Sequence, residues 1–94
     1  MINIKDIINN LNKATVLEVK RDKNSFITVS IHTPTDDLDV IYSIFSDGSG
    51  FVLNWEDMDL ITEYLTFSKE DFNLIYKEVL KELMKRAGES DENC

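Results

Sequence analysis

The first part of the chain changes from a helical to an extended pattern of apolar residues. The opening segment repeats apolar side chains at i, i+3, i+4 and i+7, which predicts a short helix over about residues 3–13. The apolar residues of this stripe are Ile4, Ile7, Ile8 and Leu11. β-Branched residues over 15–20 then predict a strand, and strict alternation over 26–32 predicts a second strand with one apolar face.

Two further strands are expected before the middle of the chain ends. Pro34 should end the second strand, because proline has no amide hydrogen to donate to a neighbouring strand. The nearly continuous apolar run over 40–45 predicts a third, central strand. Asp47-Gly48 predicts a tight hairpin turn, since glycine tolerates the positive φ that such turns need, and 51–53 would form a short fourth strand.

From Asn54 onward the apolar period becomes helical, which predicts two helices. Asn54 is a suitable N-cap for the first of them, and Glu56 and Asp57 would lie at the positive end of its dipole. The inward face of this helix would carry Met58, Ile61 and Leu65.

The last helix has the clearest signals in the chain. Ser68 is its expected N-cap, Phe67 and Phe72 have the spacing of a hydrophobic staple, and Gly88 suits the position just after the helix. Its apolar stripe consists of Phe72, Ile75, Tyr76, Val79, Leu80, Leu83 and Met84.

These elements predict an α+β domain with an N-terminal helix, a three- to four-stranded antiparallel sheet and two C-terminal helices. The 94 residues suit one domain, expected over 1–88, followed by a flexible acidic tail over 89–94. No apolar run has the length of a membrane span or of the apolar core of a signal peptide. The single cysteine, Cys94, can form no internal disulfide. We therefore expect a soluble protein of the cytoplasm.

The formal net charge of −8 comes mainly from one window. Residues 36–63 hold eight acidic residues and no Lys or Arg. These are Asp36, Asp37, Asp39, Asp47, Glu56, Asp57, Asp59 and Glu63. Such a field attracts basic surfaces and repels nucleic acid, so the expected partner is a basic, nucleic-acid-binding protein rather than nucleic acid itself. The alternative is that the window serves only solubility, although surfaces selected for solubility usually mix both signs of charge.

Residues that carry catalysis or bind metals are sparse. His32 is the only histidine and is expected on the polar face of the strand over 26–32. Cys94 lies at the end of the chain, where no scaffold would activate its thiol. The carboxylate pairs of the acidic window do not continue into a calcium-binding loop. We therefore expect neither an enzyme nor a cofactor or metal site.

The aromatic residues of the second half are expected to lie mainly in the core. They include Tyr64, Phe67, Phe72 and Tyr76. Trp55 is the exception, because it lies beside Glu56 and Asp57, and a tryptophan inside a charged rim is typical of an interface anchor.

Three segments resemble a known family. They are Asn-Ile-Lys-Asp-Ile-Ile over 3–8, Asn-Ser-Phe-Ile-Thr over 24–28, and Thr-Asp-Asp-Leu-Asp over 35–39, which continues into Val-Ile-Tyr-Ser. In these segments, and in the expected order of elements, the chain is similar to the small acidic phage-encoded inhibitors of type II-A Cas9. These are anti-CRISPR proteins that mimic DNA. The chain departs from that family at Ala14 and Thr15, where acidic and aromatic contact residues follow the family's first helix, and in its additional strand over 51–53.

The resemblance implies an inhibitor that occupies the site where Cas9 reads the protospacer-adjacent motif. Arginines contact guanines at that site, and carboxylates would bind the same guanidinium groups. The family's acidic hairpin corresponds here to Asp36, Asp37 and Asp39. The resemblance also implies that the protein acts in the cytoplasm of a cell that hosts a phage or mobile element.

The sequence thus predicts a non-enzymatic acidic inhibitor of a Cas9-type nuclease bound to its guide RNA. Its partner-binding residues would be Asp36, Asp37, Asp39, Glu56, Asp57 and Asp59, with Trp55 as an anchor. Two alternatives stay open. One is an accessory homodimer that associates through the open face of the sheet, which Ser30, His32 and Ser43 make partly polar. The other is an immunity-type protein that neutralises a basic nuclease.

Overall fold

A computed structural model describes residues 4–34, 39–54 and 61–92 of the chain, and these residues form an α+β fold. Helix α1 (Ile4–Asn9) and the 3-10 helix η1 (Leu11–Lys13) come first, and helix α2 (Lys69–Glu92) comes last. Between them lie β1 (Val16–Arg21), β2 (Ile27–Pro34), β3 (Asp39–Phe45), β4 (Ser49–Asn54) and β5 (Ile61–Thr66). Within the described ranges, no helix combines the length and apolar character that crossing a membrane requires.

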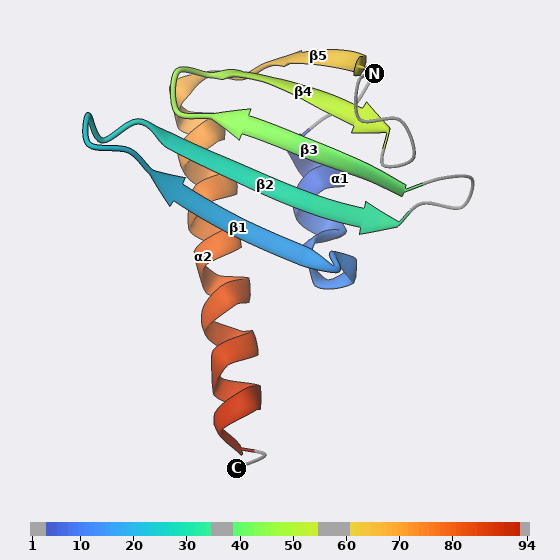
Figure 1. Cartoon of the computed structure of the whole chain (residues 1–94), viewed down its shortest axis with the longest axis vertical. Helices are drawn as coiled ribbons and strands as arrows, with labels where there is room; N and C mark the ends of the chain where they lie inside the picture. The colour runs from blue at the N-terminus through green and yellow to red at the C-terminus, as the bar shows by residue number, and fades with distance from the viewer. Residues whose placement is uncertain (1–3, 35–38, 55–60, 93–94) are drawn as a thin grey trace.

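The five strands form one antiparallel sheet in the order β1-β2-β3-β4-β5, so each strand pairs with its neighbour in sequence. Figure 1 shows this meander with α1 and α2 on the same side of it. The other face of the sheet carries no described element. Two layers therefore build the domain, and one face of the sheet stays open.

The main core lies between the sheet and the helices. Val29 and Ile31 of β2 and Ile44 of β3 are at most 1% exposed, because α1, η1 and α2 cover this face. The helices contribute Ile7, Leu11, Phe72, Ile75 and Val79. Burying each large aliphatic side chain stabilises the fold by about 1.5–3 kcal/mol. A smaller cluster of Val40, Val52 and Leu65 continues the core toward β5.

Most sequence predictions for the first half are confirmed. The alternation over 26–32 does place Val29 and Ile31 in the core, and the Asp47-Gly48 turn has Gly48 at a φ of +93°. The predicted N-terminal helix is present but interrupted, since Asn10 separates α1 from η1 and its side-chain amide donates to the carbonyl of Asp6 at 2.8 Å. Pro34 is the last residue of β2.

The helix predicted from Asn54 is wrong over the residues that can be checked. Asn54 ends β4, which is six residues long rather than three, and residues 61–66 form β5 instead of helix. Residues 55–60, with Met58, lie outside the described residues. β5 pairs with β4, and the register shifts at Val52/Leu53. This pairing provides hydrogen-bond partners for the backbone of β4, which would otherwise be the edge strand of the sheet. Tyr64, expected in the core, is 75% exposed as a result.

The last helix begins as predicted and ends later. The Ser68 hydroxyl accepts a hydrogen bond from the Asp71 amide at 3.1 Å, which confirms the N-cap. Gly88 lies inside α2, so its predicted place after the helix is wrong. Leu80 and Met84, expected on the apolar stripe, are 37% and 75% exposed. Figure 1 shows that the C-terminal part of α2 extends past β1. Leu83 still packs against the main core, so the buried stripe of the helix is narrower than predicted.

Candidate functional site

The residues predicted to bind a partner fall mostly outside the described residues. This holds for Asp36, Asp37, Trp55, Glu56, Asp57 and Asp59. Asp39 is described as the first residue of β3, where it pairs with Pro34 of β2. The described residues nearest to the predicted site are therefore the ends of the strands that flank it.

Those flanking strand ends lie at one end of the sheet. Pro34 pairs with Asp39, and the next residue, Val40, pairs with Asn54 at the end of β4. Leu53 in turn pairs with Ile61, the first residue of β5. Figure 1 shows the end of β2, the start of β3 and the end of β4 on the same side. The topology thus brings together the described ends of the two most acidic connections.

Charge is divided across the sheet. The segment 24–68, which contains β2 to β5, has no Lys or Arg, whereas Lys20 and Arg21 lie on β1 and Lys23 follows in the turn. On β1, Lys20 pairs with Glu18 at 3.0 Å, and Arg21 donates to the Tyr76 hydroxyl at 3.3 Å. The β1 side is therefore mixed in charge, and the β3–β5 side carries acids without bases.

Two described acids gather near one tyrosine on the helix-covered face. Burial raises the pKa of the Tyr42 phenol above 10.0, and the negative charges of Asp6 and Glu63 raise it further. Asp6 belongs to α1 and Glu63 to β5, so acids from elements far apart in the sequence contribute to the same field. This part of the β3–β5 side is negative beneath the sheet as well as at its end.

Asp47 has a structural role in the β3–β4 turn. Its Oδ1 accepts hydrogen bonds from the Ser49 hydroxyl at 2.6 Å and from the Ser49 amide at 2.9 Å. These bonds, the side-chain one first, lower the pKa of the Asp47 carboxyl. The Gly48 carbonyl accepts from the Phe67 amide at 2.6 Å, so this turn also anchors the start of α2.

The open face of the sheet carries an apolar groove. Val16, Ile41 and Leu53 line it from β1, β3 and β4, together with polar side chains of Glu18, Ser30, His32 and Ser43. Its volume is about 360 Å³, and Val16 at its edge is 50% exposed. Successive residues of a strand point to opposite faces of the sheet. Because the Ile31–Tyr42 pair lies on the covered face, the next pair, His32–Ile41, lies on the open face and lines the groove.

Aromatic side chains form a row on the same open face, beside the β3–β4 turn. Phe45 stacks on Phe26 with a ring-centroid distance of 6.0 Å and contacts Phe51 at 5.7 Å. Phe51 pairs with Tyr64 across β4 and β5. We call the groove and this row together the open apolar face. The Ser30–Ser43 pair forms the edge of the groove that is nearest the row.

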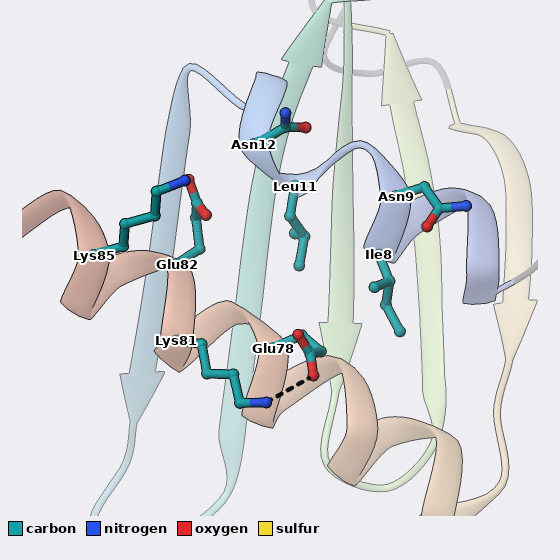
Figure 2. Close-up of a pocket in the computed structure, with 8 residues that line it drawn as sticks. All are labelled: Ile8, Asn9, Leu11, Asn12, Glu78, Lys81, Glu82 and Lys85. Atoms are coloured by element: carbon teal, nitrogen blue, oxygen red, sulfur yellow. Dashed lines mark hydrogen bonds and ion pairs between the residues drawn. The ribbon is translucent and has the colours of Figure 1, made fainter.

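A second groove, of about 370 Å³, separates the N-terminal segment from α2. Figure 2 shows Ile8 and Leu11 pointing toward α2, with polar side chains along both sides. Lys81 donates to Glu78 at 3.3 Å, and Arg86 donates to Glu82 at 3.2 Å. Arg86 also donates to the backbone carbonyls of Leu11 at 3.3 Å and Ala14 at 2.8 Å. These bonds make the groove a structural seam that ties α2 to η1.

Within the described ranges, no group of three or more His, Cys, Asp or Glu side chains could hold a metal ion. His32 is half-buried and lies in the apolar groove. Its position on the polar face of β2 is as the alternation predicts.

Comparisons with protein-family models, curated proteins and solved structures found no match to this chain. Functional arguments therefore rest on its own residues. Over the described residues, the order of five strands followed by one helix also differs from the three strands and two helices that the family resemblance implies.

Sequence reasoning missed how extensive the open apolar face is. Phe26, Phe45, Phe51 and Tyr64 are far apart in sequence, and only the strand register brings them onto one face. The available signal is that Ile41, Phe45, Phe51 and Leu53 are apolar in addition to the buried residues that alternate with them, with Ser43 as the one polar interruption.

Proposed function

We propose that this protein is a non-enzymatic inhibitor that binds the basic nucleic-acid site of a protein partner through its acidic β3–β5 side. The observation that carries the proposal is the division of charge: β2 to β5 and their connections contain no Lys or Arg. The described ends of both acidic connections lie at one end of the sheet. A surface with one sign of charge steers a basic partner and excludes DNA, which has the same sign.

The proposed contact is between carboxylates and the arginines or lysines that normally bind phosphates or base edges. Asp36, Asp37 and Asp39 would contribute from one connection and Glu56, Asp57 and Asp59 from the other. Charge-assisted hydrogen bonds between a carboxylate and a guanidinium are about twice as strong as neutral ones. Trp55 would supply an apolar anchor among these charges.

The target that we propose is a Cas9-type nuclease with its guide RNA. Support for this target comes from the resemblance of residues 35–39 and the two N-terminal segments, and not from the fold. Blocking the arginines that read the protospacer-adjacent motif would prevent the nuclease from engaging duplex DNA.

A DNA-cleavage assay with the Cas9–guide RNA complex tests this proposal. We expect the protein to inhibit cleavage at low salt and to lose most of its affinity at about 0.5 M salt, because exposed charges are screened. The variant Asp36→Lys/Asp37→Lys/Asp39→Lys should lose inhibition.

A matched control separates site from net charge. The variant Glu89→Lys/Asp91→Lys/Glu92→Lys changes the net charge by the same amount in the acidic C-terminal segment and should inhibit normally. No binding at low salt rejects Cas9 as the target. Equal loss in both variants would mean that overall charge, and not this part of the sheet, drives association.

A further inference from the structure

The open apolar face has the chemistry of an interface, and we propose that its occupant is a second copy of this chain. Two copies would stack their sheets with the helices outside, as in an aligned β-sandwich, about a two-fold axis. This inference does not depend on the proposed function, because it concerns the centre of the open face rather than the acidic end of the sheet, and it needs no other partner.

The centre of the open apolar face carries no formal charge. Apart from Asp39, which the alternation of β3 assigns to this face at the start of the strand, the residues that alternate onto it from β2 to β5 are apolar, aromatic, hydroxyl-bearing or imidazole residues. The other charges are the paired Glu18 and Lys20 on β1, where Glu18 lines the groove. A basic partner would find no carboxylate at this centre. A copy of the same face presents matching uncharged side chains, which is the condition for a self-complementary contact.

The area of the face is sufficient for a weak dimer. Five strands spaced by about 4.8 Å, with about six residues of about 3.3 Å each, present roughly 500 Å² in projection. Two such faces contribute roughly 1,000 Å² before the relief of side chains is counted, which is the lower bound for a specific interface. We therefore expect a dissociation constant in the micromolar range rather than a permanent dimer.

The contact should include both parts of the open apolar face. Ile41 lies on the central strand β3 and forms the floor of the groove with Leu53. Tyr64, which is 75% exposed, extends the aromatic row to β5. Burial of such exposed apolar side chains is the favourable term, and repulsion between two chains of charge −8 opposes it.

This balance gives the dimer a characteristic salt dependence. Salt screens the repulsion between copies and leaves the apolar contact intact, so added salt should strengthen the dimer. Binding to a basic partner, as proposed above, should instead weaken with salt. The two proposals can therefore fail separately.

Sedimentation equilibrium of the protein alone tests the inference, from about 5 to about 500 μM. We expect a monomer–dimer equilibrium that shifts toward dimer between about 0.05 and about 0.5 M salt. Ile41→Lys should weaken dimerisation at least about tenfold, since it buries a charge in the contact. Met84→Lys is the matched control, because Met84 is also an exposed apolar residue but lies on α2, away from the open face.

Tyr64→Lys decides the matter if Ile41→Lys does not fold, because a side chain that is 75% exposed tolerates lysine in the monomer. A protein that stays monomeric over the whole range overturns the proposal. So does a dimer that both open-face variants leave unchanged, or one that dissociates as salt is added.

Discussion

Two glycines make opposite demands on the backbone, and the same substitution at each gives opposite predictions. Gly48 has a φ of +93°, and a Cβ there would collide with the carbonyl oxygen of Phe67. Gly48→Ala is expected to lower the free energy of unfolding by about 1–3 kcal/mol, measured by urea denaturation. A harmless Gly48→Ala would contradict the turn geometry.

Gly88 lies inside α2 with open space around it, so Gly88→Ala should raise the free energy of unfolding by about 0.5 kcal/mol.

Tyr42 reports the negative field under the sheet. Its pKa is raised first by burial and then by Asp6 and Glu63, so its phenolate absorbance should appear above pH 10.0 in a difference titration against Tyr42→Phe. The folded state holds this proton more tightly than the unfolded chain. The resulting stabilisation is complete below the unfolded pKa and is lost as pH rises through the raised pKa. Glu63→Gln should move the midpoint of the Tyr42 titration down. A midpoint unaffected by Glu63→Gln would show that the charge of Glu63 does not act on Tyr42.

At the scale of elements, one arginine adds hydrogen bonds to the apolar packing between α2 and η1. Arg86 donates to the carbonyls of Leu11 and Ala14 and to the Glu82 carboxylate. Arg86→Met keeps much of the apolar stem but leaves the carbonyls and the Glu82 carboxylate without this donor, so we expect a loss of about 1–3 kcal/mol in unfolding free energy. Lys77→Met, on an exposed position of the same helix, should change stability by less than about 0.5 kcal/mol. Equal effects of the two variants would mean that the seam contributes nothing.

Local pattern was enough for some elements and not for others. Ser68, Phe67 and Phe72 predict the start of α2 because capping and staple contacts lie within one helical turn. Residues 54–65 were misread because Asn54 resembles a cap, and Ile61 and Leu65 are four residues apart, as on one helix face. The decisive interaction is the pairing of β5 with β4, which no local spacing encodes.

The candidate site divides in the same way. The sign and the position of the acidic window can be read directly from the sequence, because the charge of a side chain follows from its residue type. The convergence of strand ends at one end of the sheet, and the meeting of Phe45 with Phe26 and Phe51, depend on register. Register follows from the whole set of strand pairings and was not predictable from any one strand.

At the scale of the whole molecule, net charge should control self-association. The sequence pI is about 4.4, so lowering the pH from neutral toward that value reduces the net negative charge and with it the repulsion between copies. Light scattering at low salt should therefore show more dimer at about pH 5.5 than at pH 7.5, and Tyr64→Lys should suppress the increase. Equal scattering at both pH values would mean that charge repulsion does not limit association.

The meander order has a consequence for synthesis on the ribosome. Sequential hairpins let β1 to β5 pair as they emerge, since every strand contact is with the neighbour in the chain. The core face, however, is covered only after Phe72, Ile75 and Val79 of α2 have been synthesised. The nascent sheet must therefore expose apolar surface on both faces until the final quarter of the chain is available. A chain that stops at Thr66 should bind more of a hydrophobic dye than the full chain and should be digested faster by proteases, because it lacks the helix that covers the core face.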